Sequence, residues 1–306
     1  MVLSALAVLV TVLGLRYAGW DTGEARLPGD VATALLRAVL LAALCLHVGE
    51  LATARMARAV PLTPRPEPRS WARGAAWIGV GAAVGQLVLL AGTGSLVDGL
   101  TSPDLEETYG TRPGALALLE ANGFLLAAVC AAGRRPGWAA VPLAAVILGE
   151  ALRAHPETDT PEIGTALTVV HLTASALWAG GLVHVLRTMR VWRRTPGAGR
   201  ALLLRYARVA VVLLVAVSVT GTFSTLRRLP LSVVFDSAYG RTLLVKLGLM
   251  VVVCALALVA RMRLARDRRD ARSAARPARA EVVVLVVVLL VSAVLTAVPV
   301  PVGLAG

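Results

Sequence analysis

The chain has 306 residues, of which 57% are hydrophobic and 16% charged, and its formal net charge is +13. Its apolar residues gather in long runs separated by arginine-rich stretches, which excludes an ordinary soluble domain. The positive charge indicates membrane orientation rather than a nucleic-acid partner. The three cysteines are isolated within apolar runs and form no CxxC motif, so no disulfide framework is predicted.

The apolar runs predict an all-α fold, a polytopic transmembrane helical bundle with nine spans of about 20 residues each. The spans cover residues 2–20, 33–54, 74–97, 113–133, 137–154, 163–186, 203–226, 239–260 and 282–302. The first run lacks a basic start and a clean cleavage site, so we expect a retained helix. Its removal as a signal peptide would leave eight spans.

Arginines predict the orientation of this bundle. Five lie in residues 55–73, two in 133–137, seven in 187–208 and eight in 261–279, which are alternate connections. The intervening connections are acidic or mixed, and Glu150 is assigned to one of them. The positive-inside rule then predicts an N-terminus inside, a C-terminus outside and a multi-pass protein of the plasma (inner) membrane.

A proline-rich stretch divides the sequence into three regions. Residues 1–60 hold the first two spans, 61–73 form a Pro- and Arg-rich cytoplasmic linker, and 74–306 form the main transmembrane bundle. Prolines recur every two or three residues within 61–69, which predicts an extended segment there because proline breaks helices.

The span 163–186 carries the most informative polar pattern. His171 and Ser175 are four residues apart and share a helix face, with Trp178 within one turn. His171 is either a metal ligand or proton relay, or a buried histidine satisfied by a backbone carbonyl. Gly180 and Gly181 predict the close approach of another helix.

His47 and His155 each allow a functional and a structural interpretation. His47 and Glu50 are one turn apart in the inner part of span 33–54, and they either bind a metal or relay protons, or form an interfacial pair. His155 stands in an acidic outer loop that either captures a cation or is simply solvated. His184 is predicted to be interfacial.

Lys246 is the only lysine of the chain and lies within an apolar span. It shares one helical stripe with Met250 and Cys254, whose sulfur atoms either pack or bind Cu(I). A protonated ammonium cannot be a metal ligand. We expect Lys246 either to snorkel or to bond hydroxyls of span 203–226 or a carboxylate such as Glu120.

Three ordered motifs resemble the copper-resistance D (CopD) family over about residues 165–302. The string His171-Leu-Thr-Ala-Ser-Ala-Leu-Trp178-Ala-Gly180-Gly181-Leu182 is similar to that family's signature helix. Arg205-Tyr206-Ala-Arg208 followed by Thr220-Gly221 resembles its next helix. Tyr239-Gly240-Arg241 with Lys246 resembles the start of the helix after that, which assigns Tyr239 and Arg241 structural or pathway roles.

The resemblance implies an inner-membrane protein that moves copper ions from the outer compartment to the cytoplasm. It also implies an extracytoplasmic copper carrier of the CopC type as partner, besides the lipid bilayer. The family often has Gly-His-Ala where this chain has Gly149-Glu150-Ala151. His155 follows four residues after Ala151, so the outer metal site is either shifted or altered.

The sequence is also compatible with two other classes of function. A b-type haem protein needs two histidines at matching depth, and His47 matches His184 better than His171. A structural membrane subunit would bind no metal. An enzyme is not expected, because GxxxxGK[ST], HExxH and GxSxG motifs are absent.

Overall fold

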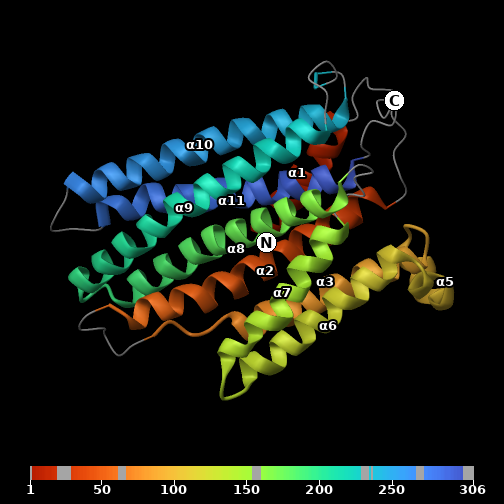
Figure 1. The fold of residues 1–306 in the computed structure, drawn as a ribbon, viewed down its shortest axis with the longest axis horizontal. Helices are drawn as coiled ribbons and strands as arrows, with labels where there is room; N and C mark the ends of the chain where they lie inside the picture. The colour runs from red at the N-terminus through yellow and green to blue at the C-terminus, as the bar shows by residue number, and fades with distance from the viewer. Residues whose placement is uncertain are drawn as a thin grey trace.

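The computed structural model describes residues 2–18, 29–60, 67–153, 160–228, 234–235, 237–266 and 272–298. Within these ranges every regular element is helical, which confirms the all-α fold class (Figure 1). The helices are α1 (Val2–Ala18), α2 (Asp30–Arg58), α3 (Ala72–Ala91), α4 (Leu96–Thr101), α5 (Leu105–Gly110), α6 (Arg112–Ala132), the 3-10 turn Pro136–Ala139, α7 (Ala140–Arg153), α8 (Pro161–Val191), α9 (Pro196–Arg228), α10 (Ala238–Arg266) and α11 (Arg272–Ala297).

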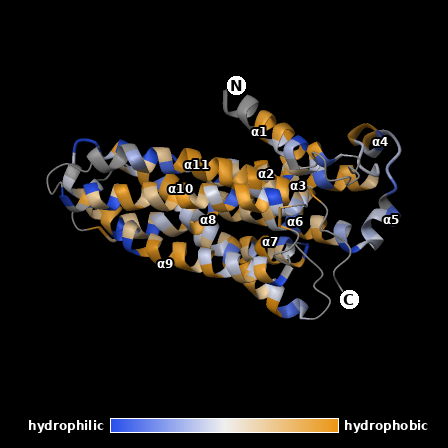
Figure 2. Cartoon of the chain, turned by 90° about the horizontal axis from the view of Figure 1, so that it is seen from above, coloured by the Kyte–Doolittle hydropathy of each residue, from blue (hydrophilic) through white to orange (hydrophobic). Residues whose placement is uncertain are grey.

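Seven of these helices are long and apolar enough to cross a bilayer: α2, α3, α6, α8, α9, α10 and α11. Figure 2 shows hydrophobic residues along their lengths and hydrophilic residues toward their ends. Their outer surfaces remain apolar, with Val212 and Val251 68% and 69% exposed. Such surfaces suit a lipid environment, so the multi-pass membrane character is confirmed.

The central helices of the bundle are α2 and α8. They pack against each other, α3 and α6 cover α2 on one side, and α9, α10 and α11 lie on the other side (Figure 1). The first spans are thus integrated with the rest of the chain. Residues 67–71, the described end of the Pro-rich linker, contain no helix, in agreement with the extended segment predicted there.

The α2–α8 contact depends on glycine. A Cβ atom added to Gly180 would lie 1.7 Å from the carbonyl oxygen of Cys45, and one added to Gly49 would lie 2.1 Å from the Gly180 carbonyl carbon. Gly181 faces the Tyr206 ring of α9, 2.9 Å from such an atom. The close approach predicted from Gly180 and Gly181 is confirmed, and it brings both backbones almost into contact.

Two apolar cores lie on either side of this contact. One is formed mainly by α8, α9, α10 and α11 and includes Trp178, Leu182 and Leu202. The other is formed by α2, α3, α6 and α7 and includes Leu40, Phe124 and Val146. The candidate site lies on the side of α8 that faces α10 and α11.

Candidate functional site

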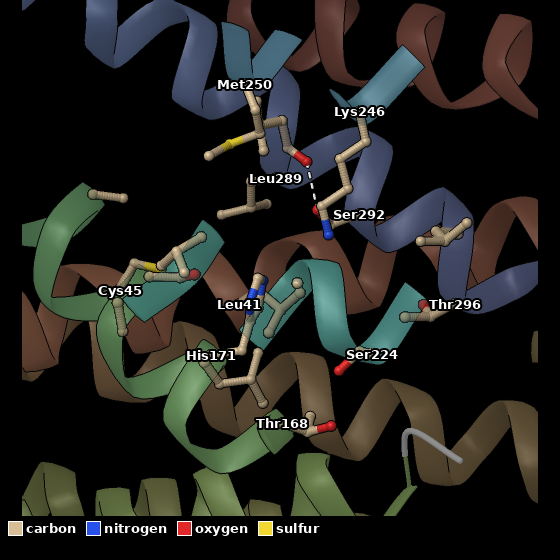
Figure 3. Close-up of a pocket in the computed structure, with 18 of the residues that line it drawn as sticks. Leu41, Cys45, Thr168, His171, Ser224, Lys246, Met250, Leu289, Ser292 and Thr296 are labelled. Carbon is tan, nitrogen blue, oxygen red and sulfur yellow. Dashed lines mark hydrogen bonds between the residues drawn. The ribbon is translucent and has the colours of Figure 1, made fainter. Parts of the chain in front are cut away.

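A cavity of about 220 Å³ lies between α2, α8, α9, α10 and α11 (Figure 3). Most of its lining is apolar. The structure brings six of the residues singled out in the sequence to this one cavity, namely His171, Ser175, Trp178, Tyr239, Lys246 and Met250. They come from α8 and α10, so two separate sequence motifs share one site.

The imidazole of His171 is oriented by the neighbouring helix. Its Nδ1 lies 3.0 Å from Oγ1 of Thr220 on α9. That hydroxyl already donates its proton to the Ala216 carbonyl at 2.6 Å, so it accepts the hydrogen bond from Nδ1–H. This pattern assigns the lone pair to Nε2, the arrangement found when a histidine binds a metal through its other nitrogen.

Gly221, the residue after Thr220, lies against the same imidazole. A Cβ added to Gly221 would lie 3.4 Å from Cε1 of His171, which is an ordinary van der Waals contact. The Thr220-Gly221 pair therefore contacts the ring of His171, and Thr220 supplies the hydrogen-bond acceptor.

Two sulfur atoms share the cavity with His171. Cys45 of α2 and Met250 of α10 line it, and both side chains are partly buried (Figure 3). Thiol, thioether and imidazole are the donor types that suit copper. Within the described residues no group of three or more His, Cys, Asp or Glu side chains lies close enough together to hold a metal ion.

Lys246 also borders this cavity, and its side chain extends into the space next to Ser292 of α11 (Figure 3). Glu120, suggested as a partner for Lys246, is engaged elsewhere. It lies on α6, is fully buried and pairs with Arg153 of α7 at 2.8 Å. The suggested Lys246–Glu120 pair is therefore wrong, because α6 and α10 lie on opposite sides of α2 and α8.

Glu150 is buried rather than part of a solvated outer loop. It belongs to the last turn of α7, lines the cavity, and lies 3.8 Å from Arg37 of α2. The assignment of Glu150 to an acidic connection is thus wrong. The guanidinium of Arg37 compensates the charge of this buried carboxylate, so α7 can continue inside the bundle past residue 150. His155 lies outside the described residues.

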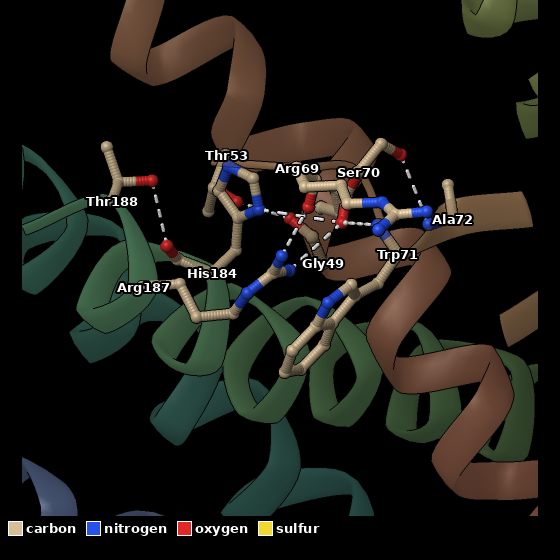
Figure 4. Close-up of polar contacts among 10 residues, drawn as sticks. Gly49, Thr53, Arg69, Ser70, Trp71, Ala72, His184, Arg187 and Thr188 are labelled. Atoms are coloured by element: carbon tan, nitrogen blue, oxygen red, sulfur yellow. Dashed lines mark hydrogen bonds and ion pairs between the residues drawn. The ribbon is translucent and has the colours of Figure 1, made fainter. Parts of the chain in front are cut away.

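His47 and Glu50 are both buried but do not form a pair that points to the surface. Oε2 of Glu50 accepts a hydrogen bond from the Trp71 backbone N–H at 3.0 Å and from Arg187 at 3.3 Å, with Nδ1 of His184 at 3.7 Å (Figure 4). Glu50, which lies on α2, therefore connects this helix to α8 through Arg187 and to the linker through Trp71.

Arg187 of α8 also makes two direct contacts with the linker. Its guanidinium lies 3.5 Å from the centroid of the Trp71 ring and donates to the Arg69 carbonyl (Figure 4). His184, predicted to be interfacial, is buried within the protein at 6% exposure. Neither His47 nor His184, the pair considered for a haem, lines the cavity at His171.

Cys254 lies one turn beyond Met250 but lines a different, smaller cavity. There the indole N–H of Trp178 donates to Oε1 of Glu281 at 3.1 Å, and the hydroxyl of Tyr206 donates to the Trp178 carbonyl at 2.6 Å. Trp178 thus connects α8 to α9 and α11.

Sequence reasoning missed Glu281. It was placed just before a span expected to begin at residue 282, whereas α11 begins at Arg272 and holds Glu281 inside the bundle, 5% exposed. The available signal was a single carboxylate between an arginine-rich stretch and a long apolar run.

The Tyr239-Gly240-Arg241 motif builds the start of α10. The Ser237 hydroxyl accepts a hydrogen bond from the Gly240 N–H at 3.1 Å, as a helix N-cap does. A Cβ on Gly240 would lie 2.1 Å from the Val234 carbonyl oxygen, so only glycine fits. Arg241 donates to the Phe235 carbonyl, which fixes the preceding turn while Tyr239 faces the cavity.

Residues 200–295 match the family model described as Copper resistance protein D. The match covers α9, α10 and most of α11, which supply Thr220, Lys246, Met250 and Glu281. No curated protein and no solved structure matches the chain.

Proposed function

We propose that this chain moves copper ions through the cavity at His171, and the match of residues 200–295 to the model described as Copper resistance protein D supports this. The observation that carries the proposal is the oriented imidazole. Thr220 holds Nδ1–H, so Nε2 can bind a metal in a cavity that also presents Cys45 and Met250. Three soft or intermediate donors in a mostly apolar lining favour a transient copper site over a permanent one.

The direction of movement follows from the proposed topology. The seven long helices together with α1 and α7 give nine spans, with the N-terminus inside and the C-terminus outside. The 3-10 turn and α7 together rise about 29 Å, which matches the hydrocarbon core. In this orientation the cavity at His171 lies nearer the outer face of the plasma membrane, where a CopC-type carrier would deliver copper.

Lys246 is proposed as a structural cation rather than a ligand. Its ammonium has no lone pair for a metal, and it borders the cavity opposite α8. We expect the Lys246→Met protein to fold but to move copper more slowly. A variant with normal expression and an unchanged transport rate would reduce Lys246 to a tolerated snorkelling residue.

Copper flux into proteoliposomes that contain only this protein tests the proposal. The wild-type protein should take up copper, and His171→Ala should abolish most of the flux at equal protein density. Cys45→Ala and Cys130→Ala form a matched pair, because Cys45 lines the cavity whereas Cys130 packs against the core on the opposite side of α2. Only the Cys45 variant should lose activity.

Two results would count against this function. Equal flux in the His171→Ala and wild-type proteoliposomes would remove the role given to the imidazole. Equal losses in the two cysteine variants would show that the measurement reports general packing rather than the cavity.

A further inference from the structure

A second cavity of about 190 Å³ lies between α8, α9, α10 and α11, nearer the arginine-rich ends of these helices. Its lining includes Tyr206, Cys254, Arg261 and Glu281. Trp178 borders both this cavity and the one at His171. The two cavities therefore lie in succession along α8 and α10, with the indole between them.

Glu281 differs from the other buried carboxylates that the structure describes. Glu50 has Arg187, Glu120 has Arg153 and Glu150 has Arg37 as a cationic neighbour. Glu281 is 5% exposed and makes no such ion pair with the residues that the structure describes, although Arg261 borders the same cavity. Its hydrogen bond from the Trp178 indole uses Oε1. An ionised carboxylate buried without a counter-charge is costly, so this position favours a bound cation.

The side chains around Glu281 indicate which cation fits. Cys254 lines the same cavity and offers a sulfur atom, the donor that selects Cu(I) over hard cations. Met250 precedes Cys254 by one turn, so the backbone positions of the two residues are separated by a rise of about 6 Å along α10. Met250 faces the first cavity and Cys254 the second.

We propose that Cys254 and Glu281 form a second copper site, separated from the His171 site by Trp178. Cys254 binds the ion through Sγ and gives its thiol proton to the Glu281 carboxylate, so the loaded site holds a Cu(I)–thiolate pair and a neutral carboxylic acid. The identity of the ion rests on the proposed function. The site itself rests on the cavity and on a buried carboxylate that has no ion-pair partner within the described part of the chain.

Protection of Cys254 from alkylation tests this site at equilibrium. The detergent-solubilised protein carries Cys45→Ala and Cys130→Ala, which leaves Cys254 as its only thiol. Free Cu(I) is set with a competing chelator, and the concentration that halves the rate of maleimide labelling is measured. Glu281→Gln keeps an oxygen that accepts from the indole but removes the charge, and should raise this concentration about tenfold or more.

Two further variants separate charge from shape and one site from the other. Glu281→Asp keeps the charge and should stay close to the parent protein. His171→Ala removes the first site and should leave the half-protecting concentration unchanged, so a failure of copper transport remains distinguishable from a failure of this site. Equal protection in the Glu281→Gln and parent proteins, or equal losses in the Gln and Asp variants, would overturn the proposal.

Discussion

The contact between α2 and α8 predicts an unusual sensitivity to a single methyl group. In Gly180→Ala the new Cβ would lie 1.7 Å from the Cys45 carbonyl oxygen, whereas non-bonded neighbours normally lie about 3.5 Å apart. Both groups belong to helix backbones and cannot rotate away. The two helices must therefore separate by roughly 1.5–2 Å, which disturbs both apolar cores.

The size of the effect is a balance of two terms. Overpacking of this kind costs about 1–3 kcal/mol or more, while replacing a helical glycine with alanine gains about 1 kcal/mol. Because the clash is between two backbones, we expect the cost to lie at the upper end, so Gly180→Ala should lose about 2 kcal/mol or more in net stability. Gly248→Ala is the matched control, because nothing lies within 4 Å of its Cβ position on α10. That variant should gain up to about 1 kcal/mol.

Thermal unfolding in one detergent and at one scan rate measures both variants against the wild-type protein. Gly180→Ala should have the lower midpoint and Gly248→Ala an equal or higher one. Copper flux should fall in Gly180→Ala as well, because Cys45 lines the cavity and moves with α2. A Gly180→Ala midpoint at or above that of Gly248→Ala would refute the close backbone contact.

Two other predictions concern polar contacts. Thr220→Val removes the acceptor for Nδ1–H of His171 and should weaken copper binding about 10–100-fold in a chelator competition titration. Thr225→Val, which removes a hydroxyl that lines the cavity on the same helix, should bind copper normally, and equal affinities in both variants would contradict the orienting role. Arg153→Met leaves Glu120 buried without its partner and should cost about 3–5 kcal/mol. The Glu120→Leu, Arg153→Met double variant should regain most of its thermal stability, and losses that simply add would argue against the pair.

The sequence predicted helix positions better than helix ends. The expected span 203–226 lies within α9, Pro196–Arg228, and the expected start at residue 282 lies ten residues inside α11, Arg272–Ala297. Hydropathy marks the part of a helix that lies in lipid, whereas alanine and arginine continue the helix beyond it. Glu281 was missed for this reason.

Helix faces were predictable, but the neighbours of each face were not. The stripe of His171, Ser175 and Trp178 follows from helical spacing, and it does face one cavity. That the imidazole meets Thr220 depends on which helix packs beside α8, which one sequence does not reveal. The pairing of Glu150 with Arg37 joins residues 113 positions apart and is hidden for the same reason.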